Sequence, residues 1–115
     1  MIDQLNAART NDPKSPILAP AFVNQLGYMA IQQGDTKSGV AIMTINVEDR
    51  PTSSNAWDSL GDAYLADGQK AKALEASEKS LQLVDSDAGE SANQKKLIRE
   101  SAQGKVDQLK GKPSS

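Results

Sequence analysis

Asp58 and Asp62, four residues apart, come nearest in this chain to forming a chemical site. On one helix they would share a face, where two like charges cost about 0.2–0.5 kcal/mol unless a counter-charge offsets them. Paired carboxylates can act as general acid and base, or they can line an acidic groove that receives a basic or hydrogen-bonding peptide. A solvated helix face is the plainer alternative. Catalysis is least favoured, because no group nearby in the sequence would shift their ionisation or bind a substrate.

The chain contains no histidine and no cysteine. This excludes disulfides, thiol nucleophiles, Ser-His and Cys-His catalytic arrangements and the usual zinc sites. We therefore expect no catalytic residue, no metal site and no cofactor. Asp85, Asp87 and Glu90 form an acidic cluster, but they lack the loop pattern of a calcium site. Asp87 and Glu90 instead have the spacing of a capping box, which predicts that they begin the last helix.

Basic residues gather toward the C-terminal end, where Glu100 and Asp107 interrupt them: Lys95, Lys96, Arg99, Lys105, Lys110 and Lys112. We interpret them as solvated helix surface, with a weak contact to an acidic partner as the alternative. The net charge of −2 gives no footprint for a phosphate backbone, so nucleic acid is not an expected partner. No apolar run approaches the roughly 18 residues that span a bilayer, and we expect no membrane insertion.

Aromatic residues make up only 3% of the chain, so the core must be built from aliphatic side chains, which favours packed helices. Apolar residues at helical spacing predict four helices between residues 21 and 84. Pro20 suits the first turn of the first helix and Gly34 its end. Asp35 is the expected N-cap of the second helix, and Ser53 or Ser54 that of the third. A narrow apolar stripe on a charged background predicts a last helix over 88–110, and residues 2–9 could form a short one.

Several residue pairs recur at an offset of 34 residues, which indicates an internal repeat of helix-turn-helix type. Leu26-Gly27 matches Leu60-Gly61, Gly34 matches Gly68, and the apolar pairs are Ile31 with Leu65, Val40 with Leu74, and Val47 with Leu81. Gly27 and Gly61 would let the paired helix approach closely, which can outweigh the roughly 1 kcal/mol that glycine costs in a helix. We interpret Trp57, Leu60 and Tyr64 as structural side chains wedged against Ala73. An exposed aromatic binding patch is the alternative.

Residues 20–87 resemble two consecutive tetratricopeptide repeats. The second repeat carries the better match, with Trp57, Leu60, Gly61, Tyr64, Gly68 and Ala73 at the signature positions. The first has Val23, Leu26, Gly27, Ala30, Gly34 and Gly39 there, and Pro51 as its closing proline. The sequence departs from the family pattern at Asn46, Ser77, Ser80 and Asp85.

The resemblance implies an all-α fold, a short solenoid of two repeats with a C-terminal capping helix. We expect an N-terminal helix and proline-rich loop over 1–19, repeats over 20–53 and 54–87, the capping helix over 88–110 and a disordered tail over 111–115. The first helix of each repeat would line a concave groove that binds a protein or peptide. Its exposed positions would be Asn24, Tyr28, Gln32, Asn55, Asp58 and Asp62. Some tetratricopeptide domains bind the C-terminal carboxylate of chaperones with a clamp of lysine and asparagine side chains. The corresponding positions here are Asn24, Tyr28 and Ser59, so the basic residues of the clamp are missing.

The stretch from Asn24 to Leu83 is also similar to the repeat tail that follows the catalytic domain in some bacterial serine hydrolases, esterase-like or beta-lactamase-like. The Gly-x-Ser-x-Gly motif of such enzymes is absent, so this chain alone could not perform their reaction. We expect a non-catalytic protein-interaction module. The alternative is a structural tail that holds subunits together, as in a homodimer. As written the chain carries no export signal and would be a soluble cytoplasmic protein; a fragment of an exported hydrolase would be periplasmic or secreted.

Overall fold

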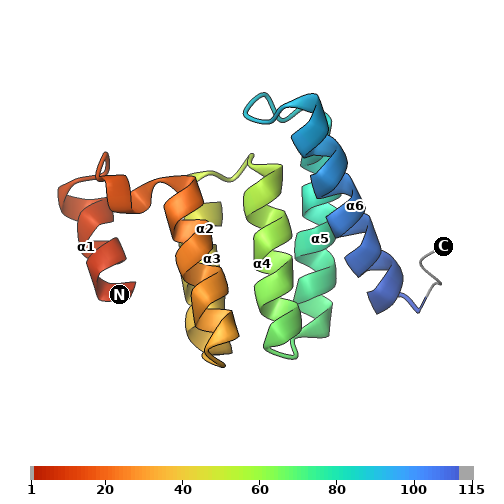
Figure 1. The fold of residues 1–115 in the computed structure, drawn as a ribbon, viewed down its shortest axis with the longest axis horizontal. Helices are drawn as coiled ribbons and strands as arrows, with labels where there is room; N and C mark the ends of the chain where they lie inside the picture. Colours follow the sequence, from red (N-terminus) through yellow and green to blue (C-terminus); the bar gives the residue numbers. More distant parts are fainter. Residues whose placement is uncertain (1, 112–115) are drawn as a thin grey trace.

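The computed structural model describes residues 2–111, and it is all-α, as predicted (Figure 1). No strand occurs within that range. The elements in chain order are α1 (Ile2–Asn11), the short 3-10 helix η1 (Pro16–Leu18), α2 (Pro20–Gln32), α3 (Thr36–Asp49), α4 (Ser54–Ala66), α5 (Lys70–Val84) and α6 (Ala92–Leu109). Of the predicted disordered tail, only Gly111 lies within the described residues, in the turn after α6.

The helix ends follow local chemistry. Pro20 occupies the first turn of α2, and the Asp35 and Ser53 side chains accept hydrogen bonds from the Ser38 and Ala56 amides, which caps α3 and α4. Gly34 and Gly68 follow α2 and α4 with φ of +85° and +78°, a left-handed conformation that favours glycine. Pro20 in a first turn, Asp35 and Ser53 as N-caps and Gly34 at a helix end were predicted, and each is confirmed.

The last helix begins differently from the prediction. Ser91 is its N-cap, accepting from the Gln94 amide, so α6 begins at Ala92 rather than at residue 88. The prediction that Asp87 and Glu90 form a capping box at the start of the last helix is therefore wrong. Asp87 instead accepts hydrogen bonds from the Ser54 amide (2.8 Å) and hydroxyl (2.6 Å), and so ties the α5–α6 loop to the start of α4.

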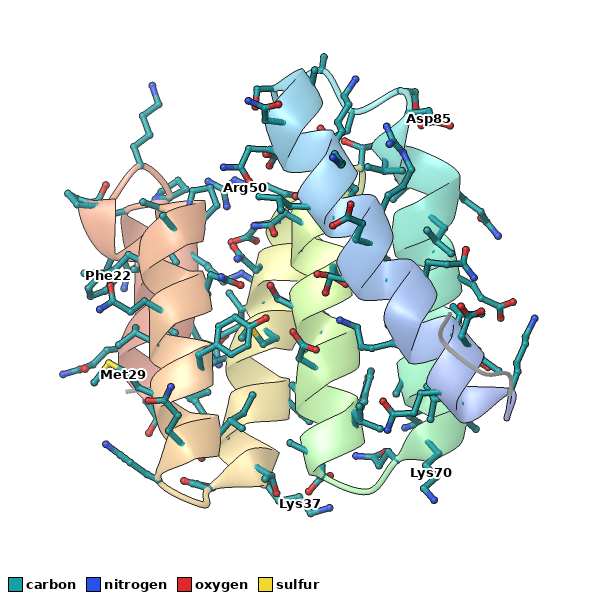
Figure 2. All side chains as sticks on the ribbon, turned by 45° about the vertical axis from the view of Figure 1, so that its right-hand side comes forward. Phe22, Met29, Lys37, Arg50, Lys70 and Asp85 are labelled. Atoms are coloured by element: carbon teal, nitrogen blue, oxygen red, sulfur yellow. The ribbon has the colours of Figure 1, made fainter. Side chains whose placement is uncertain are left out.

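The helices pack as neighbours in chain order, the arrangement of a helical-repeat, solenoid-like fold. α2 pairs with α3 and α4 with α5, while α3 packs on α4 and α5 on α6. α4 also contacts both α2 and α6, so these three helices share one face of the molecule. Figure 2 shows Lys37 and Lys70 where α3 and α5 begin, and Arg50 and Asp85 where these two helices end, on the opposite side of the molecule.

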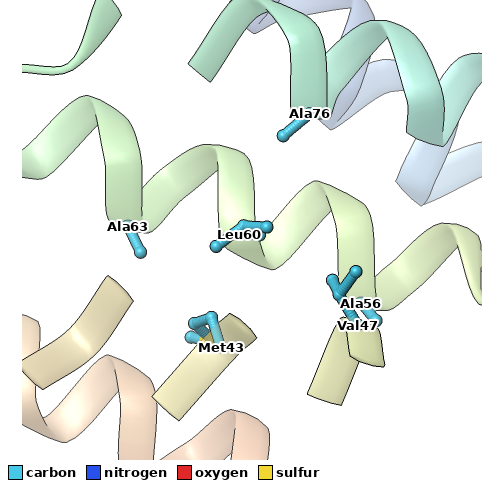
Figure 3. Close-up of a cluster of buried hydrophobic side chains, with 6 residues drawn as sticks. All are labelled: Met43, Val47, Ala56, Leu60, Ala63 and Ala76. Atoms are coloured by element: carbon cyan, nitrogen blue, oxygen red, sulfur yellow. The ribbon is translucent and has the colours of Figure 1, made fainter. Parts of the chain in front are cut away.

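Two apolar clusters form the core. The first joins the two hairpins and consists of Met43, Val47, Ala56, Leu60, Ala63 and Ala76 (Figure 3). Trp57 and Tyr64 are half-buried against this cluster, which includes Ala76 of α5 and not the predicted Ala73. The Trp57 indole donates a hydrogen bond to the Pro51 carbonyl (2.9 Å). The second cluster centres on Leu5, Leu18, Val23, Ile42 and Ile45, so α1 and η1 pack onto the first hairpin.

The glycines at 27 and 61 allow the close helix approach that the repeat pattern predicted. A Cβ at Gly27 would lie 2.6 Å from Cε of Met43, which is fully buried. A Cβ at Gly61 would lie 2.8 Å from the Ser77 hydroxyl and 3.6 Å from the Ala73 carbonyl oxygen. In both hairpins, therefore, the second helix occupies space that a side chain would need.

The side chains at two positions that depart from the family pattern, Asn46 and Ser80, make equivalent hydrogen bonds. The Asn46 amide donates to the Pro20 carbonyl (3.1 Å), and the Ser80 hydroxyl donates to the Ser54 carbonyl (2.8 Å). Donors and acceptors are each 34 residues apart. In both hairpins a buried polar side chain of the second helix thus holds the first residue of the first helix.

Asp67 links the two hairpins at the end opposite Asp87. Its carboxylate accepts hydrogen bonds from Lys37 (2.9 Å) and Thr36 (2.7 Å) at the start of α3, and from Gln69 (2.6 Å). The bond from Lys37, followed by those from Thr36 and Gln69, lowers the pKa of Asp67 to about 2. Because the folded pKa lies below the ordinary 3.8, the stabilisation is present above pH 3.8 and is lost as the pH falls through 2.

We predict that Asp67→Asn lowers the melting temperature at pH 7 but leaves it equal to that of the wild type below pH 2. Asp12→Asn is the matched control, because its carboxylate makes no hydrogen bond or ion pair within residues 2–111. Thermal unfolding followed by circular dichroism measures both. If Asp67→Asn lowered the melting temperature equally at both pH values, the stabilising role of the ionised Asp67 carboxylate would be contradicted.

We predict that Gly61→Ala destabilises the fold by about 1–3 kcal/mol, because the added methyl overlaps the Ser77 hydroxyl. The double variant Gly61→Ala/Ser77→Ala should recover part of this loss, since it removes the overlapping oxygen. Gly104→Ala, whose methyl would meet nothing within 4 Å, should stabilise α6 by about 0.5–1 kcal/mol. Urea unfolding of these variants and of the single variant Ser77→Ala gives the free energies, and additivity of the two substitutions in the double variant would argue against the contact.

Candidate functional site

The predicted carboxylate pair meets a lysine of the last helix. The Lys105 ammonium lies 2.8 Å from a carboxylate oxygen of Asp58 and 2.8 Å from one of Asp62, and it donates to the Ser101 hydroxyl (3.0 Å). Lys105 and Asp58 are only 6% and 7% exposed. The like-charge cost of two aspartates one turn apart is therefore offset by one buried cation.

The position of Lys105 follows from the packing of α6. Ile98, Ala102 and Val106 are buried and seat α6 in the stack. Lys105 precedes the last of these, so its stem is buried with them, and its Cε would lie 3.2 Å from a Cβ at Gly61. The bare backbone at Gly61 thus leaves room for the lysine stem as well as for α5.

Tyr28 brings the first hairpin into the same network. Its hydroxyl donates to Asp62 (2.5 Å) and lies 3.4 Å from the Ser59 hydroxyl. Burial, followed by the hydrogen bond to Asp62, raises the pKa of Tyr28, so the phenol stays protonated and remains a donor. Asp62 therefore receives one donor from α2 and one from α6, and it joins the three helices of this face.

Asp58 is less well satisfied than Asp62. Its Oδ1 lies close to the ammonium, but the angle is not that of a hydrogen bond, and no other donor reaches it within residues 2–111. Burial raises the pKa of Asp58, and the positive charge of Lys105 only partly opposes this. Two carboxylates thus share one ammonium, and Asp58 protonates more readily than an ordinary aspartate.

The network corrects two predictions. Asp58 was predicted to be exposed in a groove; this is wrong, because α6 covers it. Lys105 was predicted to be solvated helix surface; this is wrong for the same contact. The signal for Lys105 was present in the sequence, since residue 105 falls within the apolar stripe of Ile98, Ala102 and Val106. Lys112 lies outside the described residues.

The other predicted groove residues remain at least partly accessible. Asn24, Tyr28, Asn55 and Asp62 are half-buried, and Gln32 is exposed at the far end of α2. The structure joins Tyr28 to Asp62 directly, and Asp58 through Lys105. Asn24 contributes a buried amide oxygen that has no donor within the described part of the chain.

A hollow of about 740 Å³ adjoins this face at the end where α2 and α4 begin. The α3–α4 and α5–α6 loops line it, and its polar side chains include Arg50, Asn55, Asp87 and Glu90. Burial and the nearby Asp87 charge raise the pKa of Glu90. Sequence reasoning missed this hollow, because the two loops that line it are more than 30 residues apart in the chain.

Comparison with protein-family models and with curated proteins finds no match to this chain. Within residues 2–111, no helix is long and apolar enough to cross a membrane, and no cluster of three or more acidic side chains is arranged to hold a metal ion.

We predict that Lys105→Met destabilises the protein by about 3–5 kcal/mol at pH 7, because it leaves two carboxylates without their shared counter-charge. Lys110→Met is the matched control. Its partner Glu78 and Lys110 itself are both well exposed, so its loss should cost less than about 1 kcal/mol. Denaturant unfolding of the three proteins gives the comparison.

The deficit of Lys105→Met should shrink as the pH falls. The pKa of Asp58 is raised in the folded state. The folding stability that Asp58 contributes is therefore present below its unfolded pKa of 3.8, and it is lost as the pH rises through the folded pKa. Without Lys105 the folded pKa rises further, and protonation relieves the unpaired charge. A deficit that is constant between pH 7 and pH 4 would show that the lysine stem, and not its charge, carries the effect.

Proposed function

We propose that this chain is a non-catalytic, tetratricopeptide-like module that binds a protein or peptide segment across the face of α2 and α4. The observation that carries the proposal is the hollow beside this face, which both hairpins line and which Asn55 shares with the predicted groove. A segment lying along the groove would run from this hollow, past Asn24 and Tyr28, toward Gln32.

The chemistry of the face favours a partner recognised by hydrogen bonds. Lys105 neutralises one of the two negative charges at Asp58 and Asp62, so the pair leaves less charge for a basic partner. The amides of Asn55 and Gln32 can each both donate to and accept from a peptide backbone. Arg50 makes no side-chain hydrogen bond or ion pair within residues 2–111, and it can donate to a carboxylate or carbonyl at the hollow.

Selection of a random peptide library on the immobilised chain tests this proposal. A selected peptide titrated into the isotope-labelled protein should shift the amide resonances around Arg50 and Asn55. Arg50→Ala should weaken its binding about tenfold, the equivalent of about 1.4 kcal/mol.

Lys70→Ala is the matched control and should leave binding unchanged. It removes one cation at the opposite end of the helices from Arg50 (Figure 2). Equal weakening by both variants would point to a general charge effect. Resonance shifts confined to α5 or α6, or a library that yields no binder, would contradict the proposed face.

A further inference from the structure

Two charged side chains that line the hollow beside Asn55 have no partner in the described part of the chain. Arg50 and Glu90 are both half-buried, yet neither makes a side-chain hydrogen bond or an ion pair within residues 2–111. Every other half-buried or buried charged side chain in that range has at least one such partner. The two exceptions therefore lie together, on the two loops that form the walls of one hollow.

The other carboxylates of the hollow are already engaged. Asp49 accepts a hydrogen bond from the Arg9 guanidinium (2.9 Å), and Asp87 accepts from the Ser54 amide (2.8 Å) and hydroxyl (2.6 Å). Neither forms an ion pair with Arg50 within residues 2–111. In the described part of the chain, the unpaired charges that the hollow presents are therefore one guanidinium and one carboxylate.

The Glu90 carboxylate lies where its charge is disfavoured. Burial, followed by the charge of Asp87, raises the pKa of Glu90. The next cation along the chain, Lys95, donates instead to the Asp85 carbonyl oxygen (3.1 Å). A cationic side chain of a partner would offset the excess negative charge at this wall through a charge-assisted hydrogen bond. A bare metal ion is a poorer fit, because the Arg50 guanidinium in the same hollow would repel it.

The loops that carry these two side chains are ordered by their own hydrogen bonds. The Ser53 amide donates to the Arg50 carbonyl oxygen (3.0 Å), and the Glu90 amide donates to the Asp87 carbonyl oxygen (3.3 Å). The Asp87 carboxylate also accepts from the Gly89 amide (3.0 Å). Binding would therefore need to order the two charged side chains but not their backbone, which reduces its entropic cost.

We propose that the segment bound by this chain carries a basic and an acidic side chain, the basic one directed to Glu90 and the acidic one to Arg50. This inference rests on the proposed peptide binding and specifies its chemistry. The planar guanidinium of Arg50 can hold a carboxylate through two parallel hydrogen bonds, and Glu90 can accept from an ammonium or a guanidinium. Recognition by charge is thus concentrated at the hollow, while Asn55 and Gln32 offer neutral hydrogen-bonding groups along the face.

A peptide selected from a random library on the full chain is the probe for this inference. It is synthesised with acetylated and amidated ends, so that only its side chains carry charge. It should contain a lysine or arginine together with an aspartate or glutamate, and blocking its ends should leave its affinity unchanged. Calorimetric titration gives the Kd.

Double-mutant cycles then assign each charge to its partner. Glu90→Gln and Arg50→Gln should each weaken binding about tenfold. Neither side chain has a hydrogen bond to lose within residues 2–111, so both variants should fold, which circular dichroism checks. Replacing the basic residue of the peptide by glutamine should weaken its binding to Arg50→Gln about tenfold further but should not change its binding to Glu90→Gln. Replacing its acidic residue should do the reverse.

Glu100→Gln is the matched control, because it removes one exposed carboxylate of α6 outside the hollow and should leave the Kd unchanged. The inference is overturned by a binder that lacks the charge pair, by cycles without coupling, by equal weakening in Glu100→Gln, or by an affinity that needs free peptide ends. In those cases the proposed peptide-binding face still stands if the amide resonances around Arg50 and Asn55 shift. A library that yields no binder overturns both.

Discussion

The arrangement of three helices on one face depends on a single buried ammonium group. Removing Lys105 and Asp58 from water costs several kcal/mol for each charge, and their mutual attraction, with that of the half-buried Asp62, repays this only if the geometry is good. The network therefore adds little net stability compared with an apolar core. It does specify position, because one register of α6 on α4 places the ammonium 2.8 Å from both carboxylates.

The rest of the core is built from closely packed helices, because the chain has few large side chains. Aromatic residues form 3% of the sequence, so contact area comes from close approach rather than from bulk. Gly27 and Gly61 bring the paired helices together, and Ala56, Ala63 and Ala76 fill the space between the hairpins. Buried hydroxyl and amide groups stand in place of small apolar residues, and the Asn46 amide nitrogen and the Ser80 hydroxyl each donate to a backbone carbonyl.

The same network shapes the surface that is left for partners. Since α6 supplies its own lysine to the acidic pair, the accessible part of the α2–α4 face is mostly uncharged. The two ends of the stack also differ: α6 closes one end with a charged outer surface, whereas α1 leaves Phe22 and Met29 open at the other.

The sequence by itself determined the helices and their repeat, because both arise from local rules. Pro20, Asp35, Gly34 and Gly68 mark helix ends through backbone geometry and capping, and the 34-residue offset places each glycine against the following helix. Only the tertiary structure decided the burial of Asp58, the role of Lys105 and the tie between Asp87 and Ser54. These contacts join residues 33 to 47 positions apart. The local pattern can indicate that a residue such as Lys105 faces the core, but which charges it meets there depends on how distant helices pack.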